Sequence, residues 1–424
     1  MRTLIRNARL LCPANEIDET GDLVIEDGMI AEVGSASGKL DETLDAGGLC
    51  LSPGLIDLRV KTGEPGAEQK ETLATASRSA VAGGVTSMVV MPDTNPVIDD
   101  VALVQFIANR GRETCKTRIY PAGALTKGIK GEAMAEIGMM ADSGAVFFTN
   151  GDLPVADASV MRRTMAYAAS CGAIIASRAD DHALGKSGVM NAGALAARLG
   201  LSGLPREAEW LGLSRDLLLA EATKCTMLVD QVSTARSIDM VKAARGRGVK
   251  AWVSVAAHHL FFNELDVGDY LTYCKVNPPF RCEEDRQALI DALAEGEIDA
   301  VVSAHDPQPP EEKRLPYAEA SFGAAGLETV LSALLVLVQD GRLSMLDALM
   351  PVTASPANII GVPQGQLTAG APADLILFDP DKPWLCERET LRSRSLNSPF
   401  DGRRMVGQVM RTIVGGETVF ERER

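Results

Sequence analysis

The strongest constraint on the fold is a series of eight short apolar runs between residues 54 and 305, separated by segments that mostly have helical periodicity. The runs read GLIDLRV, TSMVVMP, RIYPAGA, GAVFFTN, GAIIAS, TMLVDQV, KAWVSVA and DAVVSAH. Near-continuous apolar runs alternating with helices are typical of a parallel sheet buried on both faces. Eight such units in roughly 300 residues predict an α/β chain with a (β/α)8 TIM-type barrel. A doubly wound open sheet is the competing architecture, but no G-x-G-x-x-G turn follows any run.

Both ends of the chain have a different pattern. TLIRNARLL and GDLVIEDGMIAEVG near the N-terminus, and GQLTAGAPADLILFD and GQVMRTIVGGETVFE near the C-terminus, are typical of short strands. Glu26-Asp27-Gly28 and Gly415-Gly416 are hairpin signals. We therefore predict a small composite β-sandwich built from residues 1–52 and 363–424, with the barrel at residues 53–362.

Charge and composition restrict the classes of partner. The 424 residues carry a net charge of -15, which argues against nucleic acid or an anionic membrane, because phosphates must be met by excess Lys and Arg. The eight scattered cysteines form no C-x-x-C pair, so reduced thiols are expected. The N-terminus has no apolar signal-peptide core, and no stretch is long enough to span a bilayer. We predict a cytoplasmic protein.

The ends of the apolar runs are where a barrel of this kind carries its functional side chains. In the first run, alternation along a strand places Asp57, Arg59 and Lys61 on one face. Two long cations one residue apart at a strand end require an explanation, because a buried cation is tolerated only when it is paired.

Six segments resemble landmark segments of dihydroorotases in the cyclic-amidohydrolase superfamily. They are SPGLIDLRVKTGEPG, GGVTSMVVMPDTNP, VNPPFR, AHDP, APADLILFDP and NSPFDG, in the family's order and over nearly the whole chain. The resemblance implies a metal-dependent barrel flanked by a β-sandwich made from the two termini.

The chain departs from this family where the family binds its metal. The family's metal-ligand and general-base positions fall at Arg59, Lys61, Gly151, Ser177, Gln231 and Ala304. Ammonium and guanidinium groups have no lone pair to donate and repel a cation, and alanine provides no base. We therefore predict no catalytic residue, no metal ligand and no cofactor.

The positions that contact substrate in the family are altered as well. The family's arginine after the first strand is Gly63 here, and the histidine that ends its Asp-His-Ala-Pro-His segment is Gln308. Asn95 and His305 match the family and are interpreted as vestiges of a substrate site. Asn95 equally serves as a turn residue before Pro96.

Arg59 and Lys61 are predicted to fill the volume and replace the positive charge of the missing metal. The candidate acidic partners are Asp57, Glu64, Asp93, Asp152, Asp180 and Asp306. The alternative is that both side chains extend to solvent at the strand's mouth.

Other candidates receive structural interpretations. His258-His259 matches a family landmark that is not a metal ligand, and a hydrogen-bonded structural role is favoured. His182 lies in a polar loop and is expected to face solvent. The loop from Pro307 to Pro316, PQPPEEKRLP, is rich in proline and charge. It is either an ordinary solvated surface loop or a partner-binding segment.

The predicted function is that of a catalytically inactive dihydroorotase-like protein. The resemblance implies a structural or activating subunit of aspartate carbamoyltransferase in de novo pyrimidine biosynthesis, present as a homodimer. One alternative is a hydrolase of the cyclic-amidohydrolase type with rebuilt site chemistry. Another is a regulator that binds a pyrimidine intermediate.

Overall fold

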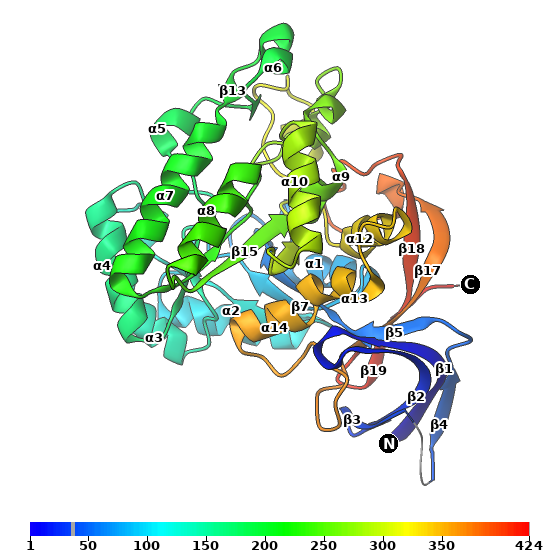
Figure 1. Ribbon diagram of the computed structural model, residues 1–424. Coiled ribbons are helices and arrows are strands. Elements are labelled where there is room, and N and C mark those ends of the chain that lie inside the picture. The colour runs from blue at the N-terminus through cyan, green and yellow to red at the C-terminus, as the bar shows by residue number, and fades with distance from the viewer. Residues whose placement is uncertain (35–38, 424) are drawn as a thin grey trace.

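The eight apolar runs form the strands of a closed parallel barrel in the computed structural model, which describes residues 1–34 and 39–423 (Figure 1). The barrel strands are β6 (Leu55–Val60), β7 (Val85–Val90), β8 (Arg118–Pro121) continuing into β9 (Gly123–Ala124), β10 (Phe148–Thr149), β11 (Ile174–Ser177), β14 (Thr226–Val229), β15 (Ala251–Ala256) and β16 (Ala300–Val302). Neighbouring strands pair in parallel, and a bridge between Val60 and His305 joins the last strand to the first. The predicted (β/α)8 barrel is confirmed.

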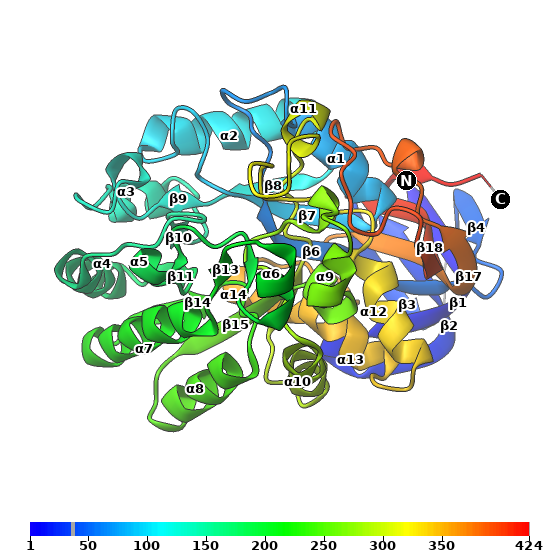
Figure 2. The same cartoon turned by 90° about the horizontal axis from the view of Figure 1, so that it is seen from above.

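Helices surround this barrel on its outer side (Figure 2). The longer ones are α1 (Leu73–Ala82), α2 (Val101–Thr114), α4 (Ala158–Ser170), α7 (Arg206–Thr223), α8 (Ala235–Gly246), α10 (Glu283–Ala294) and α12 (Val330–Gln339). Several begin at a side chain that accepts a hydrogen bond from the first turn: Thr72 accepts from the Thr75 backbone N–H, and Asp100 from that of Leu103. Such caps satisfy backbone donors that have no partner within the helix.

Shorter elements fill the connections. They are α3 (Ile137–Asp142), α5 (His182–Gly185), α6 (Ala194–Leu199), α9 (Ala257–Phe261), α11 (Pro310–Lys313), α13 (Met345–Leu349), α14 (Ala354–Ile360), the strand pair β12 (Met190–Asn191) and β13 (Gly203–Leu204), and the 3-10 turns η1 (Pro13–Asn15), η2 (Lys127–Ile129), η3 (Glu264–Val267), η4 (Thr272–Cys274), η5 (Met350–Val352) and η6 (Arg388–Thr390).

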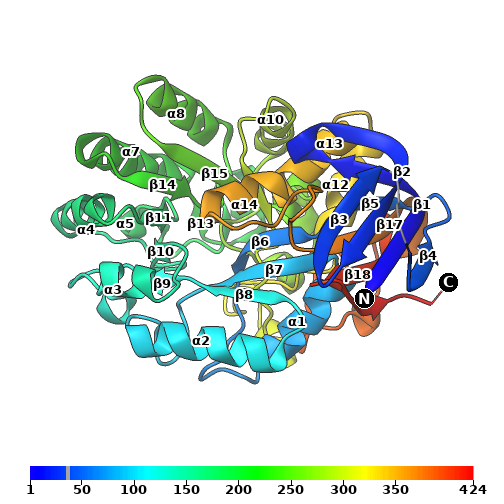
Figure 3. The same cartoon turned by 90° about the horizontal axis from the view of Figure 1, so that it is seen from below.

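The barrel interior is a packed apolar core at one end only. Ile56, Leu58, Phe147 and Leu228 pack together there, and Ile359 of α14 packs against the same cluster. Figure 3 shows α14 across the underside of the barrel. Because that end is filled with apolar side chains, polar chemistry is left to the opposite mouth, where the strands end.

The β-rich domain is built from both termini, as predicted. Its strands are β1 (Arg2–Cys12), β2 (Ile17–Glu26), β3 (Met29–Gly34), β4 (Glu42–Asp45), β5 (Cys50–Pro53), β17 (Leu375–Leu385), β18 (Arg404–Val414) and β19 (Glu417–Glu421). They form one sheet in the order β19-β18-β17-β5-β1-β2-β3, with β4 paired to β1, so that β5 and β17 join the two ends of the chain. The domain boundaries at residues 53 and 363 stay predictions.

Two of the composition-based expectations bear on the described residues. All eight cysteines are free thiols. No helix in residues 1–34 and 39–423 has the length and apolarity needed to cross a bilayer.

Candidate active site

The end of β6 contains an irregularity that sets the direction of Arg59 and Lys61. The pairing of β6 with β7 shifts register between Asp57 and Val60, and such bulges redirect side chains. The carboxylate of Asp57 accepts backbone hydrogen bonds from Arg59 at 3.0 Å and from Ser303 at 3.2 Å. Burial raises the pKa of Asp57 to about 6. Asp57 therefore holds the strand end, and it is not an ion-pair partner of either cation.

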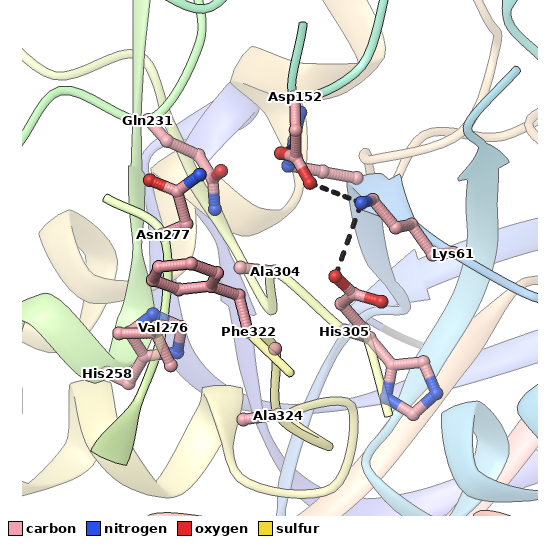
Figure 4. Close-up of a pocket in the computed structure, with 13 residues that line it drawn as sticks. Lys61, Asp152, Gln231, His258, Val276, Asn277, Ala304, His305, Phe322 and Ala324 are labelled. Atoms are coloured by element: carbon pink, nitrogen blue, oxygen red, sulfur yellow. Dashed lines mark hydrogen bonds and ion pairs between the residues drawn. The ribbon is translucent and has the colours of Figure 1, made fainter. Parts of the chain in front are cut away.

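Arg59 and Lys61 point into the barrel mouth and share one carboxylate. Arg59 pairs with Asp152 at 2.5 Å and also with Asp230. Lys61 pairs with Asp152 (Figure 4), and also with Asp93 at 2.9 Å and with Asp306 at 3.2 Å. The Arg59 side chain is only 4% exposed and that of Lys61 18%, so extension to solvent is excluded. Pairing with three of the predicted acids is confirmed.

A third cation, Arg178, completes this ion cluster, with its Nη1 atom 2.9 Å from Asp152. Burial alone would raise the pKa of Asp152, but Lys61, Arg59 and Arg178 outweigh it and hold that pKa well below its usual value. Burial alone would lower the pKa of Lys61, and the surrounding carboxylates raise it well above normal. For Asp306 burial dominates, and its pKa is raised. Burial thus favours the protonated form of Asp306 more than in a free aspartic acid.

The other predicted positions are divided between the mouth and its surroundings. Ala304 and Gln231 line the mouth pocket, and both have positive φ, 50° and 56°. A Cβ on Gly151 would lie 3.0 Å from Asp93 Cγ, so this glycine leaves room for the acid beside Lys61. Ser177 Oγ donates to Asp216 of α7 at 2.6 Å, and Ser177 does not line the pocket.

The mouth pocket measures about 340 Å³ with its opening to solvent included. Its walls are Arg59, Lys61, Asp152, Gln231, His258, Val276, Asn277, Ala304, His305, Asp306, Phe322, Gly323 and Ala324. Figure 4 shows Gln231 and Asn277 on the side opposite Lys61. Gln231 is 4% exposed, and its Oε1 atom has no hydrogen-bond partner among the described residues. A buried acceptor left in this state is destabilising by about 1–3 kcal/mol, which points to a donor supplied from outside the chain.

His305 is held in place by two hydrogen bonds. Its Nδ1 atom accepts from the Gly326 backbone N–H at 3.3 Å, so Nε2 carries the proton and donates to Glu71 Oε2 at 3.3 Å. Both side chains are fully buried. Burial would raise the pKa of Glu71, but hydrogen bonds from His305, Ser393 and other donors hold it below normal. Both ring nitrogens of His305 already have a hydrogen-bond partner within the protein. A substrate-binding role for His305 stays a prediction.

Asn95 lies outside this pocket. It is exposed, and its backbone N–H donates to the Pro65 carbonyl at 2.9 Å in a turn. Asn95 therefore has the surroundings of a turn residue, which was one of its two interpretations, and it does not line the mouth pocket.

The two adjacent histidines have the predicted structural surroundings. His259 Nε2 lies 3.1 Å from the Pro278 carbonyl and 3.3 Å from that of Pro279, and both rings pack edge-on against Phe280. Burial lowers the pKa of His259 to about 3 and that of His258 well below normal.

These histidines predict a loss of stability in acid. A histidine titrates near 6.5 in the unfolded chain, so below that pH the unfolded state binds protons that the folded state does not. The free energy of unfolding should therefore fall from about pH 6.5 towards pH 3, by up to about 1.4 kcal/mol per pH unit for each ring. Urea titrations at pH 7, 6 and 5 measure this slope, and His259→Gln should reduce it. An equal slope in that variant would contradict the assignment.

Sequence reasoning missed Asp230 and Arg178. Asp230 directly follows β14 and Arg178 directly follows β11, next to Gln231 and Ser177 respectively. Charged residues at the end of a buried strand were the available signal, and the candidate acids chosen from it did not include Asp230.

Comparison with known proteins shows which family of proteins this chain is similar to. A family model described as dihydro-orotase-like matches residues 48–237. The dihydroorotase of Syntrophotalea carbinolica is 39% identical over 421 residues, 99% of each chain, and that of Pelotomaculum thermopropionicum 40% identical over 423 residues, also 99% of each. The L-hydantoinase (dihydropyrimidinase) of Arthrobacter aurescens is 26% identical, with a TM-score of 0.90 over 100% of this chain and 96% of its own.

These relatives contradict the prediction that no cofactor is needed, because dihydroorotases and hydantoinases are typically metal-dependent enzymes. The side chains at the mouth do not fit such an ion. Arg59 and Lys61 offer no lone pair, Ala304 offers no donor atom, and the acids beside them are taken up by cations. Within residues 1–34 and 39–423 no group of three or more His, Cys, Asp or Glu side chains is arranged to hold a metal. The relatives and the described site therefore disagree on this point.

The same comparisons correct two further predictions. The interpretation as a catalytically inactive subunit, and the conclusion that the chain is not an enzyme, are both wrong. Relatives at 39% identity over the full length are dihydroorotases, and a structural neighbour is an L-hydantoinase. The loss of ligand residues was taken as loss of activity, although it records only which ligand types are missing. With similarity across the whole chain and the barrel in common, this chain belongs to the dihydroorotase-like family of cyclic amidohydrolases.

Proposed function

We propose that the chain hydrolyses a ring C–N bond of a cyclic amide of the dihydroorotate type, at the barrel mouth. The full-length relatives support the reaction class. One observation carries its assignment to this pocket: Gln231 lines it, and the buried Oε1 atom of that side chain has no hydrogen-bond partner among the described residues. A cyclic amide presents a ring N–H, the donor that this acceptor lacks, and a buried unpaired polar group discriminates strongly for a ligand that pairs with it.

The neighbouring side chains suit the remaining steps. Asp306 takes a proton from water, and the resulting hydroxide attacks the ring carbonyl carbon. Lys61, 3.2 Å from Asp306, stabilises the oxyanion that forms. When the C–N bond breaks, the nitrogen takes the proton back from Asp306, so that one water is added overall. A carboxyl whose pKa is raised by burial is suited to both transfers.

The test is steady-state kinetics of the purified chain with dihydroorotate and with hydantoin, each with and without added Zn²⁺. Gln231→Leu should raise KM about tenfold or more, because the ring N–H loses its acceptor. The matched control is Gln105→Leu on α2, where the glutamine is exposed and has no hydrogen bond in the described structure; it should behave like the wild type. Ring opening of neither compound, or equal KM in both variants, would contradict the proposal.

The dihydroorotase relatives support a place in pyrimidine biosynthesis. The homodimer and the aspartate carbamoyltransferase partner stay predictions, as does the cytoplasmic location. Stable assemblies bury on the order of 1,600 Å² or more. If the partner is correct, this chain and aspartate carbamoyltransferase, when co-expressed, should elute together in size-exclusion chromatography at micromolar concentration. Separate elution would contradict the predicted partner.

A further inference from the structure

A second, larger concavity lies outside the mouth and is lined by arginines. It runs between η4, the loop at residues 307–316 that contains α11, and the segment at residues 394–401, and measures about 1220 Å³ with its opening included. Figure 2 shows α11 near the orange C-terminal segment that follows β17. We call this concavity the arginine groove, defined by Arg314, Arg388 and Arg394 with Lys313 at its base. It includes part of the proline-rich loop for which the sequence left two interpretations open.

The arginine groove has a local charge opposite to that of the whole chain. Its lining contains three arginines, one lysine and one acid, Asp401, whereas the chain as a whole has a net charge of -15. Burial lowers the pKa of Lys313 to about 7. Arg388 pairs with Glu389 at 2.7 Å and with Asp401 at 4.0 Å, so the unpaired charge of the groove comes from Arg314 and Arg394. Arg314 and Arg394 are exposed, and the described structure gives neither guanidinium an ion pair or a hydrogen bond. In an acidic protein, unpaired arginines are readily neutralised by a neighbouring acid. Arg314 and Arg394 face one concavity and yet have no ion pair in the described structure, which indicates a site for an anion.

The other groups of the arginine groove restrict the kind of anion. Arg388 Nη1 donates to Tyr273 at 3.1 Å, which places an aromatic ring beside the charges. Leu271, Leu396 and Pro399 add apolar wall. Lys313 Nζ donates to the carbonyls of Thr272, Lys275 and Ser321 and is fixed below the surface. The groove thus offers guanidinium forks together with an apolar surface.

We propose that the arginine groove binds a small organic phosphate, with Arg314 and Arg394 holding the phosphate and the apolar wall receiving the rest of the molecule. Guanidinium forks match phosphate oxygens in bidentate geometry, which an ammonium does not. This site is separate from the mouth: Gln308 stands between them, with its side chain donating to Asp306 at 2.8 Å and its backbone N–H to Asn397 at 2.8 Å. The inference goes beyond the proposed hydrolysis and does not depend on it.

The experiment is isothermal titration calorimetry of the full chain with phenyl phosphate, inorganic pyrophosphate and citrate. We expect phenyl phosphate to bind most tightly, and its affinity to fall with added salt. Arg394→Ala should weaken it about tenfold or more, Arg394→Lys by less, and the Arg314→Ala/Arg394→Ala pair further. The matched control is Arg162→Ala/Arg163→Ala on α4, two exposed arginines that do not line the groove; it should bind like the wild type.

Three results would overturn the inference. The first is no heat of binding from either phosphate compound at millimolar concentration. The second is equal weakening by the α4 control pair, which would show general charge attraction. The third is tighter binding of citrate than of phenyl phosphate, which would assign the groove to carboxylates.

Discussion

Replacing Asp152 with Asn is expected to lower the free energy of unfolding by about 3–5 kcal/mol at pH 7. This carboxylate is shared by Arg59, Lys61 and Arg178, and both arginine side chains are 4% exposed. The substitution leaves the buried Arg178 without an ion pair in the described structure and takes one carboxylate away from Arg59 and Lys61, which keep their other acids. The isosteric amide neither clashes nor leaves a cavity. The loss is therefore electrostatic. Urea unfolding of the wild type and the variant measures it.

The pH dependence of the same variant adds a second check. The pKa of Asp152 is held below normal, so its contribution to stability is present above the unfolded pKa of about 3.9 and is lost as pH falls through that range. The difference between wild type and Asp152→Asn should shrink accordingly below about pH 4. Asp239→Asn is the control, since Asp239 on α8 is exposed and has no ion pair in the described structure; it should stay within about 0.5 kcal/mol of wild type. If Asp152→Asn also changed the free energy of unfolding by no more than about 0.5 kcal/mol, that result would contradict the stabilising role of the ion cluster.

Replacing Asp306 with Asn should lower kcat about 10²- to 10⁴-fold, the range for losing a general acid or base. Asp306 lines the mouth pocket beside Lys61, and burial raises its pKa. The amide keeps the hydrogen bond of Gln308 in place and removes the proton transfer. The measurement is turnover of dihydroorotate at saturating concentration.

Asp93→Asn is the matched control for this prediction. Asp93 lies 2.9 Å from the same Lys61 nitrogen but does not line the pocket. It changes the charge beside Lys61 equally while leaving the pocket wall intact, so its effect on kcat should be much smaller. Equal losses in the two variants would show that Asp306 acts only through Lys61, as a positioning residue.

Most of the fold is predictable from the sequence because strand and helix patterns are local. Each apolar run contributes to a strand of the barrel, and Asp27-Gly28 and Gly415-Gly416 adopt the positive φ values that their hairpins require. The single terminal sheet was harder to anticipate as such, because only the pairing of β5 with β17, more than 300 residues apart in the chain, makes it continuous.

The ion cluster was predictable in part. Alternation along β6 directs Arg59 and Lys61 to a common place, although the register shift removes Asp57 from it. Asp230 is 171 residues from Arg59, and only closure of the barrel brings them together, so no local pattern links the two. The inference of inactivity failed for a different reason. Ala304 and the cations at the ligand positions show which of the family's groups this chain lacks. They say nothing about the unpaired acceptor of Gln231 or the carboxyl of Asp306, to which we assign binding and proton transfer.

The most direct measurement follows the reaction from both sides, by NMR of the purified chain with dihydroorotate in one sample and carbamoyl aspartate in another. An enzyme accelerates ring opening and ring closure alike, because both pass through the same transition state. A cyclic amidohydrolase should therefore bring the two samples to the same final ratio, faster than buffer alone, and Asp306→Asn should slow both approaches equally. Samples that keep their starting composition as long as the buffer controls do would contradict the assignment of this activity to the barrel mouth.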